Sequence, residues 1–467
     1  MLRKILFLVF GLMLTQQVYA EQAINIQYIH ELIKQEHGIT VPYAKTDAEF
    51  PKQVANMKYL LTVVDIVNAY LNGPNWTNYG ESEYATAHAA DTVAGIYCVR
   101  NLIEHYFFEM TTTPDTTSFS LKINANGVYH IDWGDGTREH FDKPNVNQKV
   151  YSHNYATAGV YKIKIGGYSR AYSGAVFGIG TPTKLAEISG SLGKIFPTLK
   201  GYNNQPIQPC FANAFTSCSE LSGEIPADLF SGVHGAPLQW MFQRTFSGCA
   251  KLTSIHPDLF ASIRGAPAPS MFDSTFSGCT GLTILPEGLF RGIKGRPQGN
   301  MFNATFSGCK GLNCVIPNKF FGEIDGVPAG SMFAYTFSNC SGLYGEIPAD
   351  LFGGIKLTGD GQDNMFARTF ANCAKLTKIP ENLFGMLSGE TGASMFLETF
   401  IGCAGLDCEI PKNLFGAMTG APKPYMFLRT FNGCSNLKGT IPDGLFATIT
   451  GQPAINMFAQ TFSGCGN

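Results

Sequence analysis

Residues 241–267 read MFQRTFSGCAKLTSIHPDLFASIRGAP. Related phrases fill residues 210–467, as eight whole copies and a partial ninth. Each copy contains the motif T/A-F-x-x-C, and its cysteine returns every 30 to 33 residues, at Cys218, Cys249, Cys279, Cys309, Cys340, Cys373, Cys403, Cys434 and Cys465. A sequence period of this length is typical of arrays whose units stack on one another. The sequence therefore predicts a solenoid over residues 210–467.

Each copy divides into an expected strand and two expected turn regions. The L-x-x-x-I segment, for example Leu221–Ile225, is expected to be a short strand that ends at Pro226, because proline cannot donate to a strand ladder. The stretches L-F-x-x-I and M-F-x-x-T-F have helical spacing and are expected to turn along the opposite wall. Their phenylalanines would pack between copies, and each would contribute roughly 1.5–3 kcal/mol on full burial.

The array resembles the BspA-type leucine-rich repeats of bacteria, whose copies read A-F-x-x-C-x-x-L-x-x-I-x-I-P. Matching phrases include TFSGCAKLTSIHP at 245–257 and TFSGCTGLTILP at 275–286, although the units of this chain are longer in the M-F and G-x-P regions. The resemblance implies an α/β solenoid with short parallel strands. It also implies a secreted or cell-surface protein of bacteria or protists that adheres to host or neighbouring surfaces, and it leaves the ligand unspecified.

The cysteines allow two interpretations. Thirteen cysteines in a secreted chain suggest disulfides. In stacked copies, however, equivalent side chains point in parallel and are poorly aimed at one another, so the nine repeat cysteines are expected to form a structural ladder of buried thiols. Cys210 stands where other copies have Met and is expected to fill the core. For Cys314 and Cys408, a bridge to the ladder cysteine five residues earlier stays open.

Residues 1–20 have the parts of a secretory signal peptide: Arg3 and Lys4, an apolar run from Ile5 to Leu14, and a V-Y-A cleavage site. The apolar run is too short for a membrane anchor, and nothing later is long and apolar enough to cross a bilayer. Residues 21–112 are expected to be helical, with amphipathic stretches that end near Gly38, Gly73 and Tyr106. The sequence therefore predicts a secreted or cell-surface protein with an N-terminal helical bundle and no transmembrane segment in the mature chain.

Period-two patterning then predicts a small β-sandwich over residues 113–172. Its phrases IDWGDGT at 131–137 and YSHNYATAGVYKIKI at 151–165 resemble the PKD family of immunoglobulin-like extracellular modules, with a turn two residues shorter than usual. Asp132 and Asp135 are calcium-ligand candidates, but D-x-x-D-G lacks the alternating oxygens of a calcium loop, which favours turn chemistry. Residues 173–209 are interpreted as a transition that caps the solenoid.

The composition argues against nucleic acid as a partner, since 33 basic and 35 acidic residues leave no basic stripe. No metal-ligand cluster, phosphate loop, dinucleotide fingerprint or nucleophile motif appears, so no catalytic, cofactor or metal site is predicted. The chain ends within a copy at Cys465-Gly466-Asn467, which suggests either a fragment or self-association through an uncapped end.

The leading hypothesis is a non-enzymatic adhesion protein that presents its repeats to an extracellular protein or glycan. The alternatives are a purely structural extracellular component and a secreted enzyme with an unrecognised site. A binding face would carry clustered aromatic or charged side chains. The candidates named from the sequence are Trp240, His256, Arg264, Arg296 and Tyr344.

Overall fold

The computed structural model describes residues 106–200 and 206–466, apart from 328, 354, 356–362, 385–386, 388 and 417. The signal peptide predicted at 1–20 and the helices predicted before residue 106 lie outside the described residues. Within the described part, Tyr106–Thr198 and the residues from Ile207 onward belong to one compact unit. In these segments we find no helix with the length and apolar character that a membrane span requires.

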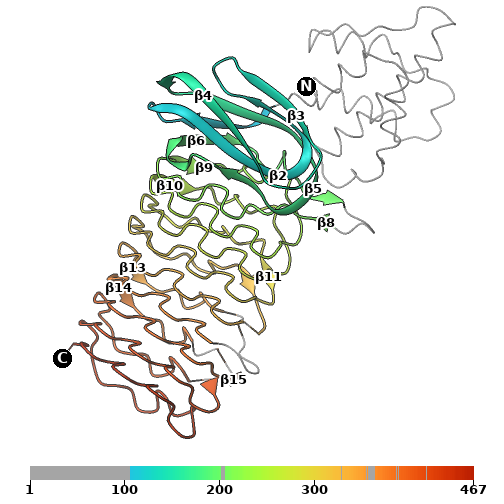
Figure 1. Ribbon diagram of the computed structural model, residues 1–467. Helices are drawn as coiled ribbons and strands as arrows, with labels where there is room; N and C mark the ends of the chain where they lie inside the picture. Colours follow the sequence, from blue (N-terminus) through green and yellow to red (C-terminus); the bar gives the residue numbers. More distant parts are fainter. Residues whose placement is uncertain are drawn as a thin grey trace, which may run out of the picture. The chain divides into compact units, whose positions relative to one another are not determined.

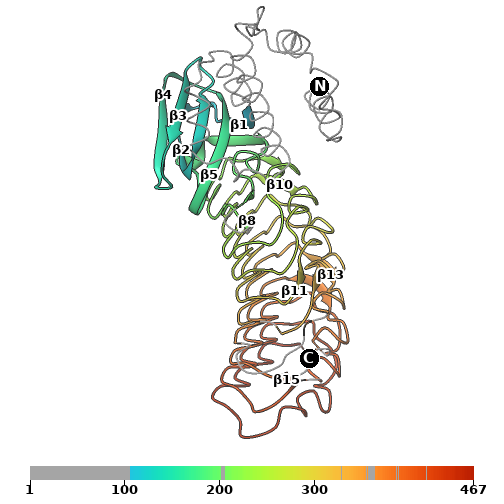
Figure 2. The ribbon, with the colours of Figure 1, turned by 90° about the vertical axis from the view of Figure 1, so that its right-hand side faces the viewer.

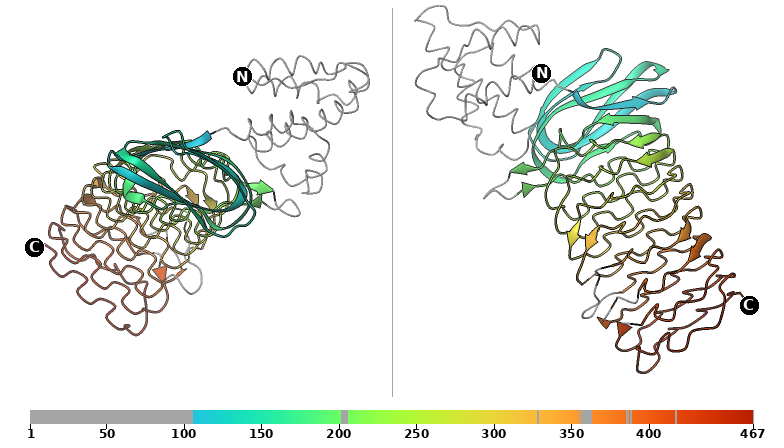
Figure 3. Two further views of the ribbon diagram at one scale, coloured as in Figure 1. Left: turned by 45° about the horizontal axis from the view of Figure 1, so that its top comes forward. Right: turned by 180° about the vertical axis from the view of Figure 1, so that it is seen from behind.

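Six strands form one antiparallel sheet at the start of this unit (Figure 1). They are β1 (Tyr106–Thr112), β2 (Thr116–Asp132), β3 (Arg138–Lys143), β4 (Lys149–Gly159), β5 (Lys162–Ile179) and β6 (Leu185–Gly190), with a 3-10 helix, η3 (Pro182–Lys184), before β6. The strand order is β3-β2-β5-β1-β6, and β4 pairs with the first half of β2. The long strands make the sheet curl strongly (Figure 3, left).

The extent of the sheet differs from the predicted sandwich of residues 113–172. Alternate residues from Phe119 to Trp133 are buried, and this phase continues through irregular pairing near Ile123 and Asn126. One long strand, β2, therefore covers the whole of this segment. Strand β1 lies at the end of the segment predicted to be helical. It is a strand rather than a helix because burial alternates there too, at Phe108 and Met110. Strand β6 lies in the predicted transition of residues 173–209.

The repeats contribute short strands that pair in parallel with the next copy. At the L-x-x-x-I position, β9 (Gly223–Ile225) pairs with β10 (Leu252–Ile255), and β13 (Tyr344–Glu346) with β14 (Lys375–Lys378). Near the G-x-P loops, β11 (Lys294–Gly295) pairs with β12 (Glu323–Ile324), and β15 (Gly389–Glu390) with β16 (Met418–Thr419). β7 (Leu199–Lys200) pairs with β8 (Pro206–Ile207). Figure 1 shows β10, β13 and β14 along one edge of the repeats, and β11 and β15 along the opposite edge.

The predicted fold class, an α/β solenoid, is wrong for the described residues, and the end of the predicted helical segment is the strand β1. Among the described residues the only helix is the three-residue η3, and the M-F-x-x-T-F-x-x-C stretches are strings of tight turns. One residue in four has positive φ, for example Trp240 (61°) and Arg244 (51°), which a right-handed helix does not allow. Amides alternate between turn bonds within the copy and bonds to the next copy, as Phe242 N donates to Met271 O. Pairs of apolar residues recur every four residues and so imitate the spacing of a helix. The backbone hydrogen bonds, however, run within single turns and to the adjacent copy.

The phenylalanine rings form stacks through the core of the repeats. The ring centroids of Phe242, Phe272 and Phe302 follow one another at 5.8 and 5.6 Å, with nearly parallel planes. The core continues into the sheet, where Phe177 contacts Phe215 at 6.0 Å and Val176 N donates to the carbonyl of the first copy. The sheet therefore closes one end of the repeats through a shared hydrophobic core (Figure 2).

Candidate binding surface

A column of residues runs along the repeats at the second variable position of M-F-x-x-T-F, and we call it the outer column. Its members all lie in the left-handed region, with φ from 49° to 60°: Asn213, Arg244, Ser274, Ala304, Tyr335, Arg368, Glu398, Arg429 and Gln460. This conformation costs a side-chain-bearing residue about 1–2 kcal/mol. It is offset by backbone bonds between copies, such as Arg368 N to Leu397 O at 2.8 Å. The side chains of the column are thus held in register from copy to copy.

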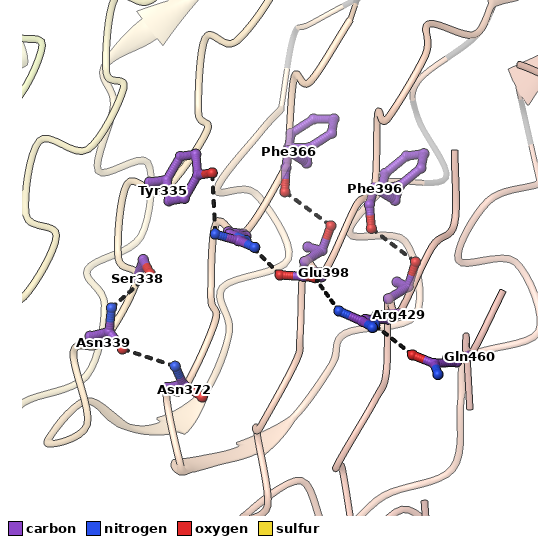
Figure 4. A network of polar contacts seen from close by, with 12 residues as sticks. Tyr335, Ser338, Asn339, Phe366, Asn372, Phe396, Glu398, Arg429 and Gln460 are labelled. Atoms are coloured by element: carbon purple, nitrogen blue, oxygen red, sulfur yellow. Dashed lines mark hydrogen bonds and ion pairs between the residues drawn. The ribbon is translucent and has the colours of Figure 1, made fainter. Parts of the chain in front are cut away.

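The last five members of the outer column form a continuous polar network (Figure 4). The Tyr335 hydroxyl accepts from Arg368 Nη1 at 3.4 Å, and Arg368 Nε donates to Glu398 Oε2 at 2.5 Å. On the other side of the carboxylate, Arg429 Nη1 lies 3.5 Å from Glu398 Oε1, while Arg429 Nε donates to Gln460 Oε1 at 2.6 Å. The Arg368 guanidinium also lies over the Tyr335 ring, 5.4 Å from its centroid. We call these five residues the outer network.

The outer network combines a buried acid with half-exposed bases. The side chain of Glu398 is 7% exposed, whereas those of Arg368 and Arg429 are 41% and 45% exposed. The hydrogen bond from Arg368 to the Glu398 carboxylate raises the pKa of Arg368 above its usual value, so this arginine stays charged. Two guanidinium groups and one carboxylate leave a net charge of +1. Glu398 therefore orients two cationic groups without cancelling them.

Further polar and aromatic side chains lie on the same string of turns. Asn372 Nδ2 donates to Asn339 Oδ1 at 2.9 Å, and Asn339 Nδ2 donates to the hydroxyl of Ser338 at 3.1 Å (Figure 4). Both asparagines occupy the second variable position of T-F-x-x-C and have positive φ. Tyr425, four residues before Arg429, is 38% exposed. Amide, guanidinium and phenol groups are thus gathered in the later copies.

The ladder cysteines lie behind this surface, in the core. From Cys249 onward, each ladder thiol donates to a phenylalanine carbonyl of the preceding copy, as Cys309 Sγ to Phe276 O at 3.1 Å. The motif threonines do the same, as Thr305 Oγ1 to Phe272 O at 2.9 Å. Burial raises the pKa of Cys309 well above its usual value. A buried thiol that does not ionise is a poor nucleophile, so these contacts are structural.

Every cysteine from Cys210 onward is free in this structure. Cys218 to Cys434 in the ladder are buried, and Cys465 is partly exposed. Cys314 and Cys408 are half-buried, and neither is bridged to the ladder cysteine of its own copy. Cys210, at the Met position, is also half-buried, and its Sγ lies 3.5 Å from Trp240 O.

The five candidate binding residues named from the sequence do not form one cluster. Trp240, 49% exposed, precedes the first full M-F pair. His256 and Tyr344 lie at the edge that carries β10 and β13, in copies that are not adjacent. Arg264 and Arg296 are exposed beside the G-x-P loops, where their Nε atoms donate to nearby carbonyls at 3.3 Å. Reading the second variable position of M-F-x-x-T-F down the copies would have found the outer network instead.

The two aspartates considered for calcium are engaged within their turn. Asp132 accepts from Gly134 N at 3.0 Å and from Arg138 Nε at 2.9 Å. Asp135 accepts from Thr137 N at 2.9 Å and lies 2.7 Å from His153 Nε2. Each of the four carboxylate oxygens therefore has a protein partner. No group of three or more His, Cys, Asp or Glu side chains that could hold a metal occurs within the described segments.

Comparisons of this chain with family models, curated proteins and solved structures find no match.

Proposed function

We propose that the protein is a non-enzymatic binding protein, secreted or held at the cell surface, that presents the outer network to an extracellular protein or glycan. The observation that carries this proposal is the half-exposed pair Arg368 and Arg429, oriented by the buried carboxylate of Glu398. Arginine and tyrosine are enriched where proteins bind partners, because both combine hydrogen-bond donors with flat apolar area. A left-handed backbone held by bonds between copies keeps such groups in place before a ligand arrives, which lowers the entropic cost of binding.

Two alternatives make different predictions. A purely structural extracellular component needs the repeats to be stable and predicts no specific ligand for the outer network. A secreted enzyme predicts turnover of a substrate. The outer network lacks a nucleophile paired with a base, since its charged groups are engaged in ion pairs and in a hydrogen bond to the Gln460 amide. Binding is therefore the function that this geometry supports best.

The test is a glycan and protein array probed with the full chain. Arg368→Gln/Arg429→Gln should abolish binding to the ligands that the wild type retains, with an unchanged circular dichroism spectrum. The matched control is Arg291→Gln, because Arg291 is 53% exposed and also forms a 2.5 Å ion pair, with Asp258 of the preceding copy. Equal binding by the double variant and the wild type, or release of product from an arrayed compound, would contradict the proposal.

A further inference from the structure

The outer network leaves directed donors unused. A guanidinium carries five N–H groups. Arg368 uses one toward Tyr335 and one toward Glu398, and Arg429 uses one toward Glu398 and one toward Gln460. About three N–H groups of each arginine thus remain for a ligand. Since both side chains are nearly half exposed, these donors can reach an acceptor on the surface.

The spacing of the two arginines selects an extended ligand. Arg368 and Arg429 lie two copies apart in the outer column, with Glu398 of the intervening copy between them. Paired strands of stacked copies lie about 4.8 Å apart, so the two column positions are separated by roughly 10 Å. Because the anionic side chain between them is 7% exposed, a ligand meets two cationic groups rather than an alternation of charges. A chain molecule with anionic groups at intervals along the repeats would satisfy both arginines.

The surrounding side chains favour a sugar polymer over an acidic peptide. Asn339, Asn372 and Gln460 offer amide groups, which match the hydroxyl groups of sugars in both donor and acceptor roles. Tyr425 adds a partly exposed ring to the same string of turns. Arginine clusters can also bind acidic peptides, but tight protein partners commonly add anchor side chains that are buried in pockets. The motif positions that could form such pockets are already filled by the buried phenylalanines.

We propose that the outer network binds a linear acidic polysaccharide, whose carboxylate or sulfate groups are received by Arg368 and Arg429. Guanidinium groups suit both anions, because their parallel N–H donors match two acceptor oxygens. This inference rests on the proposed binding function and names the ligand class for it. Binding is expected to weaken with salt, since half-exposed charge pairs are screened.

The experiment is titration calorimetry of the full chain with polygalacturonate, a sulfated polysaccharide, neutral dextran and poly-glutamate of similar length. The acidic polysaccharides should bind and dextran should not. Arg368→Gln and Arg429→Gln should each weaken binding on the order of tenfold, as expected for one lost charge-assisted interaction. Arg291→Gln should stay within about twofold, as surface substitutions usually do. The carboxylated and sulfated polymers distinguish which anion is preferred.

Arg368→Lys is the control for a folding defect. It keeps the charge but loses the paired donors, so it should retain only part of the affinity. Dextran binding equal to that of the acidic polymers, or an equal loss in the Arg291 control, would overturn the ligand assignment. So would tight binding of poly-glutamate without polysaccharide binding. If a protein or neutral glycan from the array binds and the double arginine variant abolishes it, the ligand class is wrong while the binding function stands. If no arrayed ligand binds, both the proposed binding function and the ligand class are contradicted.

Discussion

Phe302→Ala should lower the free energy of unfolding by about 4 kcal/mol. The ring is fully buried, stacked between Phe272 at 5.6 Å and Phe333 at 5.9 Å and angled against Phe290 at 4.9 Å and Phe321 at 4.6 Å. Losing burial of about 150 Å² at about 25 cal/mol per Å² gives about 4 kcal/mol. The value lies in the range of roughly 3–5 kcal/mol seen for phenylalanine to alanine changes in cores. Rings of two other copies face the cavity, so it cannot collapse without moving a copy.

Urea titration of the full chain, followed by tryptophan fluorescence and circular dichroism, measures this loss. In a Trp76→Phe/Trp240→Phe background, Trp133 is the one remaining tryptophan, and because it is buried in the sheet its fluorescence reports the sheet end of the unit. Because stacked copies unfold partly independently, the dichroism transition of Phe302→Ala should begin at lower urea than the Trp133 transition. The control is Val315→Ala, 50% exposed, which should cost less than about 0.5 kcal/mol. Equal shifts for the two variants would refute the view that stacked phenylalanines carry the stability.

Three further changes test separate contacts. Thr305→Val should cost about 1 kcal/mol, since Phe272 O loses its hydroxyl donor; thermal unfolding measures this, and Thr253→Val, whose hydroxyl bond is exposed, should change little. Burial raises the pKa of Tyr151 to about 12, so stability should be complete below the unfolded value of about 10 and fall toward pH 12. Tyr151→Phe should flatten that decline, and an unchanged decline would contradict it. The Cys309 thiol should resist a thiol reagent until urea unfolds the chain, and rapid native labelling, read by peptide mass, would count against burial.

Sequence patterns identified the repeat unit but not its backbone conformation. Phe302, Thr305 and Cys309 stand at fixed positions of the motif, and each is buried. The same motif has apolar pairs every four residues, and over nine residues this differs little from a helical period of 3.6. The deciding interactions are backbone hydrogen bonds between residues about 30 apart in adjacent copies, such as the bond from Phe302 N to Met332 O. Local spacing does not contain that information, and so the turns resembled helices.

The sheet shows a second limit of local patterns. Alternation from Phe119 to Trp133 keeps one phase, and on that basis alone the segment could have been assigned to one strand. Strand β2 continues through Gly127, which pairs with Lys143, although glycine in a strand often marks an irregular point. Strand β1 was missed because its apolar residues, at Phe108 and Met110, are too few to decide between strand and helix. Pairing with β5 and β6 on both sides decides the matter.

The outer network was inaccessible to single-residue reasoning for a related cause. Arg368, Glu398 and Arg429 are about 30 residues apart in the sequence, and each one alone looks like an ordinary surface residue. Stacking places them in adjacent copies, where a carboxylate between two guanidiniums relieves a repulsion that three like charges at a spacing of about 4.8 Å would suffer. The alternation of charge down one column is therefore readable once copies are aligned by their Met-Phe pairs. In stacked repeats, groups that can recognise a ligand are therefore better sought in columns of variable positions than among residues taken one at a time.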